Sequence, residues 1–191
     1  LCFSEATSRT AAGEILEIVA QRRVDTSAAE YEEIVRGKTA WLIRASCQLG
    51  ALRAGATDAQ AAAAAAYGEN LGMAFQMVDD ALDFAPESLT GKPTGGDVRE
   101  GKLTPPLRLY RLGLEQEERV AFDAAFGCGL MTENDAAAIA ERIRDAGHDQ
   151  RTRLDADAYL ATARDALDTL PDRPERELMR QMADYVRDRK K

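Results

Sequence analysis

The stretch from Gly68 to Phe84 is predicted to be helical, within a helix that begins near Thr57, and its two faces differ in chemistry. Apolar residues recur every three or four positions, which is the spacing of one helix face: Leu71, Ala74, Phe75, Val78 and Leu82. Polar residues recur at the same spacing on another face: Gln76, Asp79, Asp80 and Asp83. No lysine or arginine occurs between Gly68 and Pro86. The stretch therefore predicts an amphipathic helix that carries three unneutralised carboxylates within about one turn.

These three carboxylates are candidate ligands for a divalent cation. Like charges at this spacing destabilise a helix by roughly a few tenths of a kcal/mol per pair, and a bound cation would turn that repulsion into attraction. Mg²⁺ suits such a site, because it takes one or two carboxylates, keeps several waters and shares the remaining positions with substrate phosphates. We therefore predict that Asp79, Asp80 and Asp83 hold Mg²⁺. The alternative for this pattern alone is a solvated helix face.

The segment downstream of this helix, from Gly91 to Pro106, supplies charges of the opposite sign. Lys92 and Lys102 each follow a glycine. Glycine lets the backbone approach an anion closely, and a lysine ammonium reaches a phosphate oxygen as a mobile point charge. The carboxylates and the lysines together predict a site that binds diphosphate, with a metal ion between the carboxylates and the phosphate oxygens. This combination argues against the solvated helix face.

Three motifs between Phe75 and Thr104 resemble the second aspartate-rich region of the trans-type isoprenyl diphosphate synthases, in particular the long-chain polyprenyl group. They are F-Q-x-x-D-D-x-x-D from Phe75, G-K-x-x-G-x-D from Gly91 and G-K-x-T from Gly101. Two upstream elements extend the resemblance over nearly the whole chain. Gly37-Lys38-Thr39-Ala40 is similar to the family's K-T-[AG] element, and Gly13-Glu14-Ile15-Leu16 is similar to its G-E-x-x-Q element.

The resemblance implies an all-α fold, an isoprenoid-synthase-type helical bundle around a central cavity. It also implies a Mg²⁺-dependent prenyltransferase that condenses isopentenyl diphosphate with an allylic diphosphate to make a polyprenyl diphosphate. On this basis Lys38, Lys92 and Lys102 contact diphosphate, and Thr39 and Gln76 lie beside the allylic carbocation. Lys38, Thr39 and Gln76 are the catalytic candidates, and Asp97 is expected to order the glycine-rich loop or an outer-shell water. The resemblance further implies a homodimer.

Compared with the family, the chain begins partway through the fold, so we expect its N-terminal half and the first aspartate-rich motif to be absent. The 191 residues alone are then predicted to be inactive. A non-catalytic helical subunit or binding fragment of the same fold is the alternative function. A terpene cyclase is a weaker one, because cyclases typically lack the G-K-x-x-G-x-D loop. Two residues depart from the family pattern: Glu17 replaces a glutamine, and Pro105 replaces a leucine or phenylalanine.

Bulk properties narrow the functional class. A length of 191 residues suits one helical domain over residues 1–191. A net charge of -8 argues against binding to nucleic acid. No apolar run approaches the roughly 20 residues that span a bilayer. Three widely spaced cysteines predict neither a disulfide framework nor a zinc site, so a cytoplasmic location is expected.

Helix boundaries are marked by three capping patterns, in which a serine or threonine is followed three residues later by an acidic or amide side chain. A long helix is predicted from Ser27 to Gly55. Gly68 and Gly72, four residues apart, predict close approach of a neighbouring helix, and Pro105-Pro106 predict the start of another. No convincing strand is found. The capping pairs are Ser27 and Glu30, Thr57 and Gln60, and Thr132 and Asp135.

Overall fold

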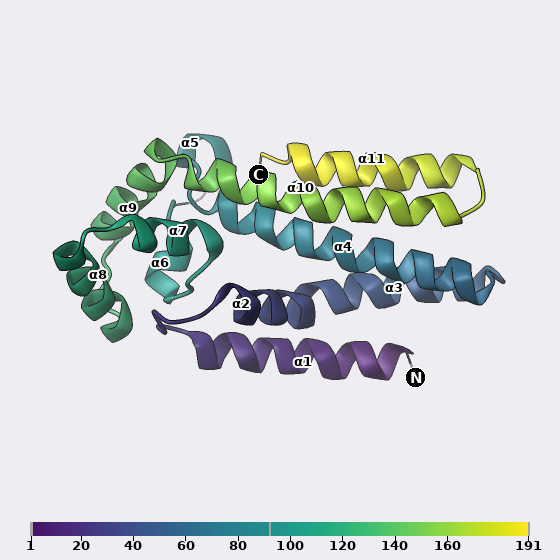
Figure 1. Cartoon of the computed structure of the whole chain (residues 1–191), viewed down its shortest axis with the longest axis horizontal. Helices are drawn as coiled ribbons and strands as arrows, with labels where there is room; N and C mark the ends of the chain where they lie inside the picture. Colours follow the sequence, from purple (N-terminus) through teal and green to yellow (C-terminus); the bar gives the residue numbers. More distant parts are fainter. Residues whose placement is uncertain (1, 92, 191) are drawn as a thin grey trace. The chain divides into compact units, whose positions relative to one another are not determined.

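The structure, a computed structural model, describes residues 2–91 and 93–190. In these ranges it is all-α, as predicted, and contains no β-strand (Figure 1). The helices are α1 (Cys2–Ala20), α2 (Ala28–Val35), the π-helix η1 (Arg36–Ala40), α3 (Trp41–Arg53), α4 (Asp58–Leu82), α5 (Glu87–Thr90), α6 (Gly96–Glu100), α7 (Pro105–Gly113), α8 (Gln116–Cys128), α9 (Glu133–Asp145), α10 (His148–Ala166), the 3₁₀-helix η2 (Leu167–Thr169) and α11 (Pro174–Asp188).

The chain divides into two compact units. Unit 1 contains the residues up to Leu16, Glu32–Gln76 and Asp155–Arg189. Unit 2 contains Glu17–Tyr31, Met77–Leu154 and Lys190. Helices α1, α2, α4 and α10 contribute residues to both units. The single domain expected for residues 1–191 stays a prediction.

All three predicted capping boxes are present at helix starts. In each, the hydroxyl accepts a backbone N–H three residues on, and the later side chain accepts the backbone N–H of the capping residue. These reciprocal bonds satisfy donors that the first turn of a helix leaves free. Helix α7 begins at Pro105, where a proline costs nothing because the N–H it lacks has no helical partner. The boxes are Ser27 with Glu30, Thr57 with Gln60, and Thr132 with Asp135.

Unit 1 is held together by glycines at helix crossings. A Cβ added at Gly13 would lie 2.2 Å from the backbone nitrogen of Lys38, and one added at Gly37 would lie 2.9 Å from Cα of Gly13. The backbones of α1 and η1 therefore touch. The predicted close approach at Gly68 and Gly72 is confirmed, because added Cβ atoms would meet the backbone of α3 and of η1 at 2.7 Å in each case.

The predicted long helix from Ser27 to Gly55 contains a π-helical segment that the sequence did not predict. The backbone N–H of Trp41 donates to the carbonyl of Arg36, five residues earlier, in place of the regular four. Lys38 and Thr39 lie inside this segment. π-Turns are rare in proteins, and those that occur are often found at functional sites.

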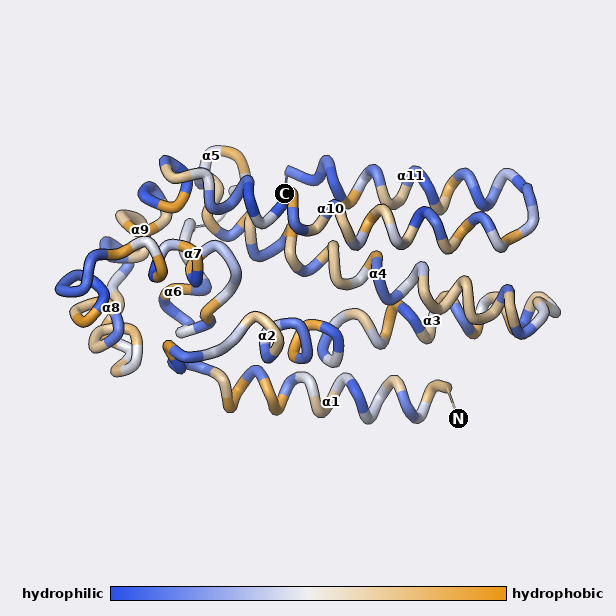
Figure 2. Tube along the Cα trace, in the orientation of Figure 1, coloured by the Kyte–Doolittle hydropathy of each residue, from blue (hydrophilic) through white to orange (hydrophobic). Residues whose placement is uncertain are grey.

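The C-terminal helices of unit 1 pack on α4 and on each other. The hydroxyl of Tyr67 donates to the carbonyl of Met179 at 2.8 Å, and Arg164 pairs with Asp184 at 2.7 Å, so α10 and α11 run side by side (Figure 1). Helix α11 is mainly hydrophilic along its length and α4 mainly hydrophobic (Figure 2). None of the helices in the described ranges has both the length and the apolar character that crossing a membrane requires.

Unit 2 has an apolar core contributed by α6, α7, α8 and α9, which lie together in Figure 1. Its ring contacts include Phe122 stacked on Phe126 with centroids 5.4 Å apart. The guanidinium of Arg144 donates to the carbonyl of Phe84 at 2.6 Å, which ties α9 to the end of α4. The buried core residues are Phe84, Val98, Leu103, Leu107, Tyr110, Leu114, Phe122, Phe126, Ala136, Ile139, Ala140 and Ile143.

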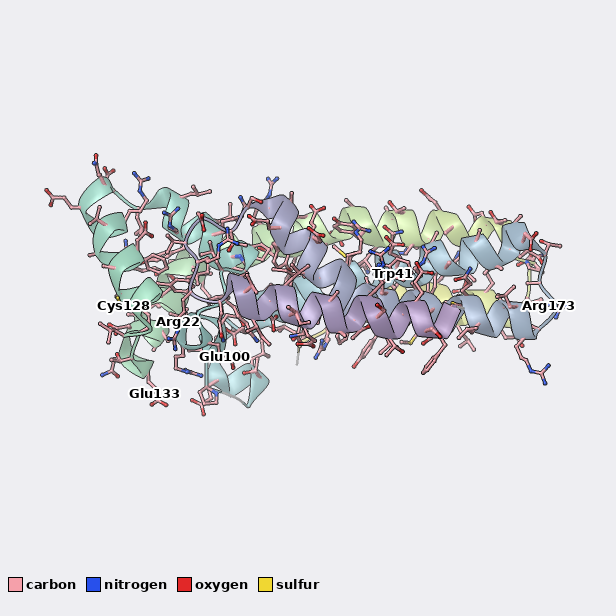
Figure 3. All side chains as sticks on the ribbon, turned by 90° about the horizontal axis from the view of Figure 1, so that it is seen from below. Arg22, Trp41, Glu100, Cys128, Glu133 and Arg173 are labelled. Carbon is pink, nitrogen blue, oxygen red and sulfur yellow. The ribbon has the colours of Figure 1, made fainter. Side chains whose placement is uncertain are left out.

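Arg22 joins the turn after α1 to two other segments of unit 2. It has φ 64°, a left-handed conformation that is costly for a residue with a Cβ. Its backbone N–H donates to the carbonyl of Gly101 at 2.6 Å. Its side chain occupies the space beside Gly129, where a Cβ would lie 2.5 Å from the guanidinium carbon (Figure 3). The segment that carries Lys102 is thereby fixed to the end of α1.

Candidate functional site

The predicted metal ligands lie at the C-terminal end of α4. Asp79 and Asp80 are in its last turn, which contains no basic residue, and Asp83 directly follows. The backbone carbonyls at the end of a helix give it a partial negative charge, so carboxylates there are unfavourable. Asp80 is buried, and Asp79 is partly buried. A cation would relieve this concentration of negative charge.

Asp80 has a specific donor in the same unit. The hydroxyl of Tyr31 donates to Oδ2 of Asp80 at 2.5 Å, and both side chains are buried. A charge-assisted bond of this length is among the stronger hydrogen bonds in proteins. Tyr31 is not among the predicted site residues, because 49 residues separate it from Asp80 and no local pattern indicates that contact.

Asp83 is engaged by the start of α6. Its two oxygens accept the backbone N–H groups of Gly96 at 3.0 Å and Asp97 at 2.9 Å, donors that the first turn of α6 leaves free. Burial raises the pKa of Asp83, although these two hydrogen bonds oppose the shift. In this arrangement Asp83 orders the loop after α4, and its role as a metal ligand stays a prediction.

Asp97 was expected to order the glycine-rich loop or an outer-shell water and was not among the predicted metal ligands. Its Oδ2 is buried and has no hydrogen-bond partner in the described part of the chain. Burial, followed by the negative charges of Asp80 and Asp83, raises the pKa of Asp97 well above its ordinary value. An orphaned buried acceptor beside two other carboxylates fits a position that faces a cation or its bound water. In the sequence, the position of Asp97 in the G-K-x-x-G-x-D motif was the only indication that it lies near the metal site.

Lys102 lies in the same unit as these carboxylates. Its Nζ is 2.7 Å from Glu100 and 3.8 Å from Glu17, and its backbone N–H donates to the carbonyl of Asp97 at 2.8 Å. Burial alone would lower the pKa of Lys102, but the hydrogen bond to Glu100 and the charges of Glu17, Glu100 and Asp97 outweigh it and raise the pKa. Lys102 is therefore a full cation, and Glu17, the departure noted in the sequence, is one of its partners.

The predicted catalytic residues form a second cluster, within unit 1. The hydroxyl of Thr39 donates to Oε1 of Gln76 at 3.0 Å, so the structure brings these two residues into direct contact. Nζ of Lys38 lies 3.8 Å from the carboxylate of Glu14 on α1. Lys92, the remaining predicted diphosphate ligand, lies outside the described residues.

Within residues 2–91 and 93–190 no group of three or more acidic, histidine or cysteine side chains forms a ready metal cage. Mg²⁺ can bind through one or two protein carboxylates, with water and phosphate in its other positions. Asp79 and Asp80 can supply those carboxylates. Asp97 can accept a hydrogen bond from a bound water.

The chain is similar in sequence to known prenyl diphosphate synthases. A family model described as Polyprenyl synthetase matches residues 1–143. The heptaprenyl diphosphate synthase component 2 of Geobacillus stearothermophilus is 40% identical over 179 residues, which are 91% of this chain and 53% of that protein. The geranylgeranyl diphosphate synthase of Methanosarcina mazei is 33% identical over 186 residues, 96% of this chain and 55% of that protein. The chain spans about half the length of these relatives.

A solved structure is also similar. It is a polyprenyl synthase from Caulobacter crescentus, crystallised with calcium and isoprenyl diphosphate. The superposition has a TM-score of 0.92 at 36% sequence identity, and it covers 100% of this chain and 58% of that one.

Proposed function

Because the chain belongs to the polyprenyl synthetase family, we propose that it is part of a prenyltransferase that condenses isopentenyl diphosphate with an allylic diphosphate to give a polyprenyl diphosphate. The observation that carries this proposal is the clustering in unit 2 of three carboxylates, the buried Asp80 and the partly buried Asp83 and Asp97, with the cationic Lys102. The Caulobacter crescentus structure, with its calcium and isoprenyl diphosphate, supports it.

In the proposed reaction the bond between the allylic carbon and the diphosphate oxygen breaks, and the electron pair leaves with diphosphate. The double bond of isopentenyl diphosphate then attacks the allylic cation, and loss of a proton restores neutrality. Charge on the leaving diphosphate has to be neutralised away from water. Mg²⁺, when bound, supplies part of that neutralisation.

We assign the remaining roles to residues of this chain. Asp79 and Asp80, with Asp83 as predicted, hold the metal, and Asp97 accepts a hydrogen bond from a metal-bound water. Lys102 and Lys38 bind diphosphate, as does Lys92 on the family pattern. The Thr39 hydroxyl and the Gln76 amide, already in contact, stabilise the allylic cation through their oxygen dipoles.

We also propose a homodimer in the cytoplasm. Large apolar side chains on α1 are exposed, which supports their burial against a second copy of the chain. They include Phe3, Ile15, Ile18 and Val19.

Calorimetric titration of inorganic diphosphate into the 191-residue chain, with and without Mg²⁺, tests the proposed site. We expect binding that requires Mg²⁺ and weakens at least about tenfold in Asp79→Asn, because a metal ligand is lost. Asp165→Asn, which alters an exposed carboxylate on α10, is the control and should bind as the unchanged chain does.

Elongation is assayed separately, with isopentenyl diphosphate and an allylic diphosphate. We expect none from the 191 residues alone, because the chain spans about half of its relatives. Elongation by this chain would show that the further length is unnecessary. Equal diphosphate binding with and without Mg²⁺ would contradict the proposed function.

A further inference from the structure

The hydrogen bond from Tyr31 to Asp80 links a side chain of no assigned role to a proposed metal ligand. Tyr31 is 9% exposed and Asp80 is 6% exposed, and their oxygens are 2.5 Å apart. Tyr31 lies in the first turn of α2, and its own backbone N–H donates to the carbonyl of Ser27 at 3.0 Å. The capping box of Ser27 and Glu30 fixes that turn, so the tyrosine hydroxyl has a well-defined position.

A carboxylate in the last turn of a helix turns readily about its side-chain bonds unless something holds it. A hydroxyl bound to Oδ2 fixes the plane of the carboxylate and so fixes the direction in which Oδ1 points. Mg²⁺ requires nearly ideal octahedral geometry at about 2.1 Å from its ligands, whereas Ca²⁺ accepts longer and more variable arrangements. Orientation of a ligand therefore matters more for Mg²⁺ than for Ca²⁺.

We propose that Tyr31 is a positioning residue, which holds the carboxylate of Asp80 in the orientation that Mg²⁺ requires and so favours Mg²⁺ over larger cations. The inference rests on the proposed function, since it assigns to Tyr31 a role in the same metal site. Tyr31 touches neither the diphosphate nor the metal in this assignment. It acts on the metal through Asp80.

The test measures the affinity for Mg²⁺ and for Ca²⁺ in the presence of inorganic diphosphate, by calorimetry on the 191-residue chain. Tyr31→Phe removes the hydroxyl and keeps the ring. We expect the Mg²⁺ affinity to fall about tenfold or more, as for other partners that orient metal ligands, and the Ca²⁺ affinity to fall much less.

Tyr67→Phe is the matched control. It also removes a tyrosine hydroxyl that donates a hydrogen bond, here to the carbonyl of Met179 at 2.8 Å in unit 1. A general loss of rigidity would act alike in both variants and on both cations. Tyr67→Phe should therefore leave the ratio of Mg²⁺ to Ca²⁺ affinity unchanged.

A second pair of variants separates positioning from misfolding. If Tyr31 acts through Asp80, adding Tyr31→Phe to Asp80→Asn should cause no further loss of Mg²⁺ affinity, whereas independent effects would add. A further loss in the double variant, or an unchanged affinity ratio in Tyr31→Phe, overturns the inference and leaves the proposed function intact. Absence of Mg²⁺-dependent diphosphate binding in the unchanged chain overturns the proposed function and the inference with it.

Discussion

The carboxyl group of Asp97 combines burial with two negative neighbours, Asp80 and Asp83, and its Oδ2 has no hydrogen-bond partner in the described part of the chain. Because its pKa is raised in the folded chain, folding favours the protonated form. This contribution to stability is present at low pH and is lost as pH rises through the raised pKa. The pKa of Asp83 is raised in the same direction, so both groups destabilise the metal-free chain at neutral pH.

Replacing Asp97 by asparagine should therefore stabilise the metal-free chain at neutral pH, because the amide mimics the protonated acid. We expect the gain in unfolding free energy to shrink as pH falls toward the ordinary aspartate value of 3.8. Urea unfolding of both proteins across this range, in the presence of a chelator, measures the difference. Asp165→Asn, at an exposed position, should show no such trend. A gain that grows on acidification would contradict the assigned direction of the shift.

Helices α1 and η1 meet where Gly13 and Gly37 bring two backbones into contact. Only glycine fits at position 13, because a Cβ added to Gly13 would lie 2.2 Å from the backbone nitrogen of Lys38 and 2.6 Å from the carbonyl carbon of Gly37. Backbone atoms cannot move aside by changing rotamer, as a flexible side chain can. The position of Lys38 and Thr39 therefore depends on a glycine in another helix.

Gly13→Ala should destabilise the chain by about 2–3 kcal/mol, the upper part of the range for overpacking. Gly50→Ala is the control, since Gly50 is also helical, in α3, and nothing lies within 4 Å of its added Cβ. There the gain in helix propensity should stabilise the chain by about 0.5–1 kcal/mol. Both values come from urea unfolding followed by circular dichroism. Equal effects of the two substitutions would show that the helix contact at Gly13 is not close.

Elements set by neighbouring residues were predictable from the sequence, and contacts between distant residues were not. Three capping boxes and the helix that starts at Pro105 follow from spacing alone, and all are present. The π-segment around Lys38 has no local signal in the sequence. Thr39 and Gln76 could be assigned together only from the family resemblance, because 37 residues separate them. Tyr31 was missed because its role arises from burial and from a partner elsewhere, whereas Asp97 was expected to order the glycine-rich loop or an outer-shell water.

At the scale of the whole molecule, an acidic chain with a net charge of -8 has to bring two like-charged copies together if it is to dimerise. Apolar burial offsets this repulsion at roughly 25 cal/mol per Å² removed from water. The exposed apolar side chains of α1 provide such area, and they include Ile15 at 61% exposure.

Sedimentation equilibrium should therefore give twice the monomer mass of 20.8 kDa. Ile15→Glu should shift the protein to the monomer, because it places a charge in the proposed interface. Val120→Glu, at a position of 64% exposure on α8, is the control and should leave the dimer intact. A monomer mass for the unchanged chain at all concentrations would contradict the proposed homodimer.

The π-segment Arg36–Ala40 has one further consequence, for insertions and deletions. A π-turn holds one residue more than the α-turn it replaces, as the bond from the Trp41 N–H to the Arg36 carbonyl shows. Winding the same residues as regular α-helix would turn the side chains before and after the segment relative to each other by ~100°, whereas deleting one residue here would leave their relative orientation nearly unchanged. Inside a regular α-helix such as α4, by contrast, a deleted residue turns everything after it by ~100°. Within these five positions the backbone conformation therefore matters as much as residue identity, because it sets the orientation of the side chains on either side.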